Sequence, residues 1–198
     1  MDNTAPNAEL AALLAKYDAN GGVIDYVFLD VPEGLSSSGL HRAAALAGIA
    51  VIDKRLEQWA IQNASKKYPI GSFYRLRWEA NKLTGERVDF TTFWGSDDVE
   101  SKKLGKNAWS IPNIDGYKTA FFHPPYPLRG TDGEKLKLFE GINKHLLGDE
   151  PGQAEIFSWS TDWSNYFKAG HEWWGAFYWT IRSIGSPYFA VVGVSSTD

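Results

Sequence analysis

Apolar side chains recur at three- and four-residue spacing in two segments near the N-terminus, on either side of a strand-like run. The spacing predicts one helix over residues 7–18 and a longer one from residues 36–38 to about Ala64. Between them, residues 23–31 (VIDYVFLDV) are rich in β-branched and aromatic side chains and end at Pro32, which predicts a strand. The apolar stripe of the longer helix is expected to comprise Leu40, Ala44, Ala47, Val51, Ile52, Leu56 and Trp59.

Gly48 lies in the middle of that longer helix. A glycine inside a helix costs roughly 1 kcal/mol relative to alanine, so its presence needs a reason. Two interpretations stay open: the helix packs closely against a neighbour at this point, or it breaks here into two shorter helices.

Alternation of apolar and polar positions marks residues 72–80 (SFYRLRWEA) and 87–94 (RVDFTTFW). The connecting NKLTGE supplies the polar and glycine residues that a turn needs. We therefore predict an antiparallel hairpin with charged side chains on its outer face.

The remaining chain begins with an irregular segment and continues with helical and strand-like patterns. Residues 95–116 show no clear periodicity and are either a functional loop or mobile. Residues 117–125 (YKTAFFHPP) resemble a short strand that ends at the double proline. A helix is expected over 134–148, closed by Gly148. Its apolar side is expected to comprise Leu136, Phe139, Ile142 and Leu146.

Three further strands are predicted near the C-terminus, over residues 154–160, 176–183 and 187–195, with a tight connection between the last two. Helices and strands do not alternate regularly, and hairpins imply antiparallel pairing. The sequence thus indicates an α+β fold, an antiparallel sheet with helices packed mainly on one face. A chain of 198 residues suits one such domain over residues 1–198.

Composition argues against several classes of function for this chain. A net charge of −4 argues against a nonspecific nucleic-acid binder, which would carry a basic face. The chain has no cysteine, which excludes disulfides, thiolate metal ligands and a cysteine nucleophile. The N-terminus lacks the basic and apolar runs of a signal peptide, and no apolar run reaches the roughly 20 residues that span a bilayer. We expect a soluble cytoplasmic protein that binds neither membrane nor nucleic acid.

Residues 157–181 (FSWSTDWSNYFKAGHEWWGAFYWTI) hold five of the nine tryptophans. One interpretation makes this stretch core: Asp162 caps a short helix, Gly170 ends it, and the chain returns from His171 and Glu172 as a central strand. Under this interpretation, the tryptophans expected to be buried in the sheet are Trp159, Trp174 and Trp179.

The other interpretation makes part of the stretch a recognition surface, because indole rings alternate there with hydroxyl, amide and carboxylate groups. Either Trp163 or Trp173 is expected to keep an exposed edge near the polar groups. Acidic side chains of the irregular segment are further candidate contacts. The predicted binding residues are Asp162, Trp163, Asn165, His171, Glu172, Trp173, Asp97 and Asp98.

Residues 159–167 (WSTDWSNYF), 171–175 (HEWWG) and 194–198 (VSSTD) resemble a group of uncharacterised bacterial single-domain proteins, and residues 123–128 (HPPYPL) are similar to it as well. The resemblance covers roughly the C-terminal 75 residues and implies no catalytic residues or mechanism. Some small bacterial proteins of this general kind are immunity partners of secreted toxins.

Motifs for catalysis, metals and phosphates are weak. The four histidines are scattered, and no G-x-S-x-G elbow is present, so we expect no catalytic residues, no metal and no cofactor. Residues 34–41 (GLSSSGLH) lack the lysine of a P-loop, and a plain N-cap is favoured over an anion site there. The one enzymatic alternative is a glycan-active or other hydrolase that uses Asp162 and Glu172 as paired carboxylates. The leading hypothesis is a non-enzymatic binding protein, plausibly an immunity protein that occludes the active site of a toxin.

Overall fold

The computed structural model describes residues 7–30, 37–65, 76–95 and 115–195, and the side chain of Trp173 lies outside this description. The described strands form a five-stranded antiparallel sheet in the order β1-β5-β4-β3-β2. Their bounds are β1 Ile24–Asp30, β2 Gly85–Val88, β3 Glu155–Trp159, β4 Phe177–Arg182 and β5 Tyr188–Val194. The three predicted C-terminal strands and the strand at residues 23–31 are confirmed.

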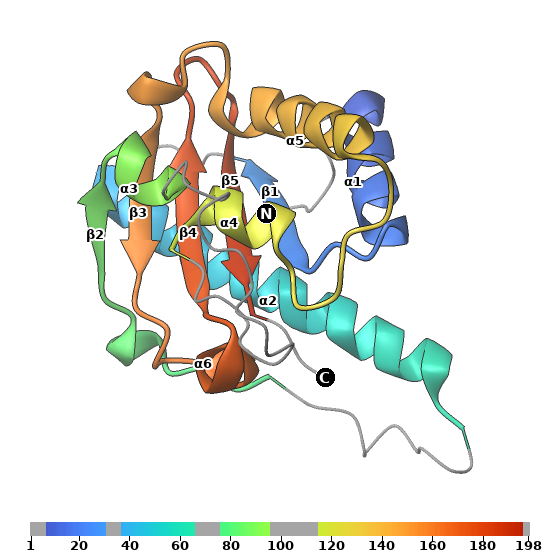
Figure 1. Cartoon of the computed structure of the whole chain (residues 1–198). Coiled ribbons are helices and arrows are strands. Elements are labelled where there is room, and N and C mark those ends of the chain that lie inside the picture. The colour runs from blue at the N-terminus through green and yellow to red at the C-terminus, as the bar shows by residue number, and fades with distance from the viewer. Residues whose placement is uncertain (1–6, 31–36, 66–75, 96–114, 196–198) are drawn as a thin grey trace.

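Helices cover the sheet on both faces (Figure 1). The α-helices are α1 Ala8–Ala19, α2 Ser37–Asn63, α3 Phe90–Trp94, α4 Tyr117–Phe122, α5 Asp132–Leu147 and α6 Lys168–Trp173. Short 3₁₀ turns are η2 Ala80–Lys82, η3 Pro151–Gln153 and η4 Asn165–Phe167. Most of the helices, namely α1, α3, α4 and α5, pack on one face, and the long α2 covers the other. The α+β class predicted from the sequence is confirmed.

The alternation of side chains along each strand divides the core into two layers. On β1, Tyr26 and Phe28 face the layer that contains α1, α4 and α5, whereas Val27 and Leu29 face α2. Both faces of the central strand β4 are covered by helices, with Trp179 and Ile181 in one layer and Tyr178 and the polar Thr180 on the side of α2.

The predicted hairpin is wrong. Gly85–Val88 is a strand, but it pairs with β3, with Val88 opposite Ile156. In the described part of the first predicted strand, Trp78 forms only an isolated bridge with Ser164. Residues Phe90–Trp94 form α3 because the Asp89 carboxylate accepts from the backbone N–H of Thr92 at 2.7 Å.

The strand predicted at residues 117–125 is also wrong, because residues Tyr117–Phe122 form α4. Tyr117, Ala120 and Phe121 are buried at helical spacing, and the prolines that follow cannot continue a helix. The run is too short for this three- and four-residue spacing to repeat, so the sequence pattern did not distinguish a helix from a strand.

The helix α2 is continuous, so Gly48 does not mark a break. A Cβ atom at Gly48 would lie 2.7 Å from the Tyr178 hydroxyl and 2.7 Å from a Val191 methyl, which confirms close packing against the sheet. The predicted stripe is wrong at its C-terminal end, since Leu56 and Trp59 are exposed there. The last turns of α2 extend past the sheet, as Figure 1 shows, so none of the described strands lies beneath them.

The helix α5 matches its prediction, with a capping box between Thr131 and Glu134 and with Gly148 at its end. Phe139, Ile142 and Leu146 are buried as expected. Leu136 is exposed instead, and Leu138 takes its place in the core.

Candidate functional site

The tryptophan-rich stretch is mostly core. Trp159, Trp174 and Trp179 are buried, as predicted. Trp163 is only 1% exposed, so it does not keep the exposed edge that was expected of either Trp163 or Trp173, and the side chain of Trp173 lies outside the description. Its Nε1 donates to the Ser160 carbonyl at 2.6 Å, and its ring packs against Tyr178 in the layer beneath α2.

The local structure around these rings differs from the expected capped helix. Asp162 is exposed, and the cap of η4 is Ser164, whose Oγ accepts from the backbone N–H of Tyr166 at 3.2 Å. Gly170 lies inside α6 rather than ending it. Glycine is needed at this position because the Gly175 carbonyl oxygen lies too close for a Cβ atom. Gly175, with a φ of 137°, adopts the positive-φ conformation that separates α6 from β4.

Trp174 is buried for a different reason from the one predicted. It is the C-cap of α6 rather than a strand residue. Its Nε1 donates to the His123 carbonyl at 3.0 Å, which ties α6 to the end of α4. His171 and Glu172 likewise belong to α6 and not to a strand.

Replacing Ser164 with alanine is expected to lower the free energy of unfolding by about 1 kcal/mol, because the cap of η4 is lost. Replacing Asp162 with alanine is the matched control, two positions away, and should change stability by less than about 0.5 kcal/mol. Urea denaturation of both variants measures the difference. An equal loss in the two variants would show that Asp162 also contributes to the cap.

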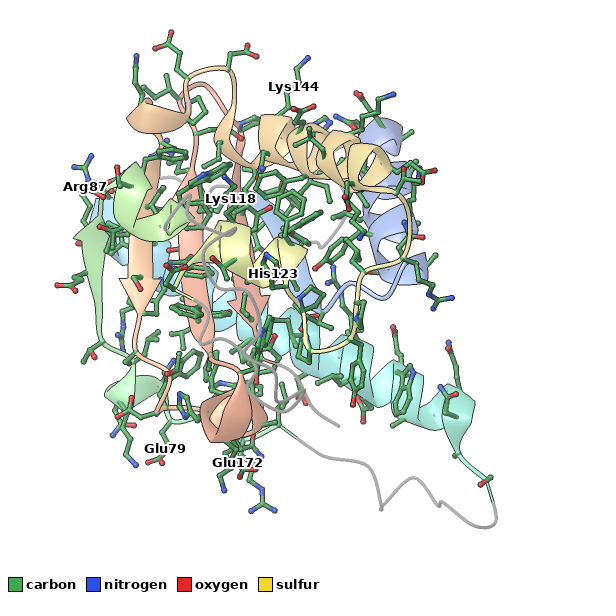
Figure 2. The ribbon with its side chains drawn as sticks, in the orientation of Figure 1. Glu79, Arg87, Lys118, His123, Lys144 and Glu172 are labelled. Atoms are coloured by element: carbon green, nitrogen blue, oxygen red, sulfur yellow. The ribbon has the colours of Figure 1, made fainter. Side chains whose placement is uncertain are left out.

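The other predicted binding residues separate into structural and surface groups. Asn165 is structural: its Oδ1 accepts from the Arg77 backbone N–H at 2.7 Å, and its own N–H donates to the Arg77 carbonyl at 3.1 Å. His171, exposed on α6, contacts the Thr161 hydroxyl through Nε2 at 2.7 Å. Figure 2 shows Glu172 at the same end of the molecule as Glu79. Asp97, Asp98 and the side chain of Trp173 lie outside the described residues.

The proposed carboxylate pair of Asp162 and Glu172 has surroundings unlike those of a glycosidase. The bond between Thr161 and His171 brings the two segments together, but both carboxylates are exposed. The general acid of a glycosidase keeps its proton because an apolar pocket disfavours its charged form. Asp162 instead lies near the Lys82 ammonium group, whose pKa is raised mainly by Glu79 and, to a lesser degree, by Asp162.

A buried polar chain that we did not predict lies between α2 and the sheet. His41 is fully buried, and its Nδ1 lies 2.8 Å from the Thr180 hydroxyl, which also accepts from Trp159 Nε1 at 2.9 Å. His41 Nε2 lies 3.6 Å from the Glu155 carboxylate. Burial lowers the pKa of His41 to about 4, although Glu155 opposes this shift. The sequence offered one indication that His41 is buried: it lies between Leu40 and Ala44, on the apolar stripe of α2.

A second unpredicted group is the carboxylate of Asp25 at the start of β1. The Tyr166 hydroxyl donates to Asp25 Oδ2 at 2.7 Å. Burial raises the pKa of Asp25, and the bond from Tyr166 and the charge of Arg55 only partly offset this effect. The opposite residue on β5 is Gly193, where a side chain would collide with the Tyr166 hydroxyl.

Replacing Asp25 with asparagine is expected to stabilise the fold at pH 7. A raised folded-state pKa means that the ionised form costs stability, and this cost appears as pH rises above the unfolded-state pKa. Asparagine keeps an acceptor for Tyr166 without the charge. Urea denaturation should show the gain at pH 7 and its disappearance near pH 3, where Asp25 is protonated in both states. Asp30→Asn, at the exposed end of the same strand, is the control; an equal gain there would contradict the explanation.

The last unpredicted feature is an exposed apolar surface at the outer end of α2, residues 56–63. Trp59 and Ile61 are each 54% exposed, and Leu56 is 37% exposed. Leu56 and Trp59, three residues apart, lie on the same side of the helix, whereas Ile61 lies nearly opposite Trp59, because each residue turns an α-helix by about 100°. We call Leu56 and Trp59 the outer α2 surface. Large apolar side chains gathered on one helix end are typical of interaction sites, and tryptophan is enriched where binding energy concentrates.

No family model, curated protein or solved structure matches the chain. Within the described ranges, no helix combines the length and the apolar character needed to cross a membrane. In the same part of the chain, no three histidine or acidic side chains gather as the ligands of a metal ion would.

Proposed function

We propose that the chain is a non-enzymatic bacterial protein that binds a protein partner, and that the partner is a toxin whose active site it covers. The observation that carries the proposal is the outer α2 surface, where the neighbouring side chains of Leu56 and Trp59 are exposed. Burial of such side chains in an interface supplies binding energy without any catalytic group. The choice of a toxin rests on the resemblance of residues 159–175 to the bacterial single-domain group.

The charge of the chain supports occlusion as the mechanism. A net charge of −4 favours the encounter with a basic partner, and a toxin that acts on nucleic acid or on phosphates presents a basic active site. The exposed side chains of Asp162, His171 and Glu172 are proposed as further contacts. None of these contacts requires a shifted pKa or an open cleft.

The direct experiment co-expresses the chain with the product of each neighbouring gene and measures growth and pull-down. We expect one neighbour to be toxic alone, harmless with this chain, and retained on it. If no neighbouring product is toxic or bound, the proposed function is wrong.

The surface is tested with a double variant, Leu56→Ser with Trp59→Ala. We expect it to fold normally and to weaken partner binding by at least tenfold, because two apolar contacts are lost. Ile184→Ser is the matched control, since Ile184 is 72% exposed but lies in the turn between β4 and β5. Equal binding by the double variant and the control would remove the outer α2 surface from the interface.

A further inference from the structure

The N-terminal end of α2 gathers hydrogen-bond donors and positive charge around a single carboxylate. The Ser37 hydroxyl donates to Glu155 Oε1 at 2.5 Å, and His41 Nε2 lies 3.6 Å from Glu155 Oε2. Arg182 lies directly opposite Glu155 in the register of β3 and β4. Arg87, which Figure 2 shows at the β2 edge of the sheet, acts on the same carboxylate.

The electrostatics of Glu155 reflect these neighbours. Burial alone would raise the pKa of Glu155, but the bond from Ser37, the contact with His41 and the charge of Arg87 together hold this pKa below its ordinary value. Arg87 thus acts on the carboxylate from β2, and Arg182 lies opposite Glu155 on β4. The positive end of the helix dipole also favours an anion here.

His41 provides independent evidence that the N-terminal end of α2 can bind a hydrogen-bond acceptor. Its Nε2 is fully buried and has no hydrogen-bond partner among the described residues. Trp159 can only donate to the Thr180 hydroxyl, which leaves the hydroxyl proton for His41 Nδ1. In this arrangement the neutral imidazole carries its own proton on Nε2, directed at the carboxylate. The distance of 3.6 Å is too long for a hydrogen bond, so this donor is left unsatisfied.

We propose that this end of α2 is a binding site for an oxoanion group, a phosphate or a carboxylate, and that Glu155 fills it in the isolated chain. Ser37, His41, Arg87 and Arg182 are the residues that hold the anion. The Glu155 side chain is 24% exposed, so rotation about its own bonds can carry the carboxylate into solvent. A phosphate group brings up to two negative charges where Glu155 brings one, and it therefore competes well for the two arginines.

The site is separate from the outer α2 surface. Ser37 and Trp59 lie at opposite ends of the same helix, about 30 Å apart at 1.5 Å per residue. Loss of one site therefore leaves the other intact, and failure of the proposed toxin binding says nothing about the anion site.

The test measures the binding of inorganic phosphate by calorimetry at constant ionic strength. Glu155→Ala removes the internal anion and is expected to bind phosphate at least tenfold more tightly than the unmodified chain. Glu86→Ala is the matched control, because it removes the same charge from the exposed neighbouring strand β2. Adding Arg182→Met to Glu155→Ala should abolish the gain.

Equal phosphate affinity in the unmodified chain, Glu86→Ala and Glu155→Ala would overturn the proposal. So would a gain in Glu155→Ala that survives the addition of Arg182→Met. Glu155→Gln keeps the side-chain volume and replaces Glu155→Ala if that variant does not fold. Acetate, titrated in the same way, distinguishes a carboxylate ligand from a phosphate: tighter binding of acetate than phosphate assigns the site to carboxylates.

Discussion

Truncating Trp163 to alanine is expected to lower the free energy of unfolding by about 3–5 kcal/mol. The indole is almost fully buried between Phe167 and Tyr178, and its Nε1 satisfies the Ser160 carbonyl. The variant leaves both a cavity and an unpaired carbonyl, and each is costly in a closely packed layer. Urea denaturation, followed by far-ultraviolet circular dichroism, measures the loss.

Trp59→Ala is the matched control, because it removes the same side chain from the outer α2 surface. Its effect on stability should be clearly smaller than that of Trp163→Ala, since Trp59 is 54% exposed and less apolar area leaves the core. If the two variants lose stability equally, Trp163 is not the core residue that the structure shows.

Acidification from pH 6.5 to pH 4 is expected to destabilise the fold, because His41 takes up a proton more readily in the unfolded chain. The pKa of His41 falls from an ordinary 6.5 to about 4 on folding, because its buried ring disfavours the charged form. Between these values the unfolded chain binds a proton that the folded chain does not, so stability is full above pH 6.5 and is lost as pH falls. Urea denaturation across this range gives the slope.

His41→Gln should flatten this part of the pH profile, although it lowers stability at pH 7. His171→Gln, on the exposed surface of α6, should leave the slope unchanged. The pKa of Glu155 is lowered on folding, so Glu155 adds a loss in the same direction below its ordinary value of 4.5. A slope that persists in His41→Gln would assign the acid sensitivity to another group.

The local pattern of apolar residues was enough to predict the elements in which that pattern repeats over several helical turns or several strand alternations. The helices α1, α2 and α5 and the strands β1, β3, β4 and β5 follow their predictions because each repeats one period over most of its length. The apolar character of β4 on both sides also indicated its central place. These features depend only on which residues follow one another.

Short elements were predicted less well, because a single local bond changes their state. The carboxylate of Asp89 turns an alternating run into α3, and the Ser164 hydroxyl rather than the Asp162 carboxylate caps η4. Alternation over four or five residues fits a strand and a helix about equally, so such runs are ambiguous until their neighbours are known.

The sequence by itself determined the α+β class, the long helices, the C-terminal strands and the burial of Trp159 and Trp179 in those strands. Tertiary structure alone decided which of the remaining aromatic side chains face solvent. Exposure depends on the elements that pack against a residue in space, and these are distant from it in the sequence. Trp163 is buried since residues from α2 and β4 close over it, and Trp59 is exposed since α2 continues beyond the sheet. The chain of Ser37, Glu155, His41, Thr180 and Trp159 joins residues up to 143 positions apart, obtained as 180 − 37. No local pattern encodes such a chain, because its hydrogen bonds form only after α2 packs on β3 and β4.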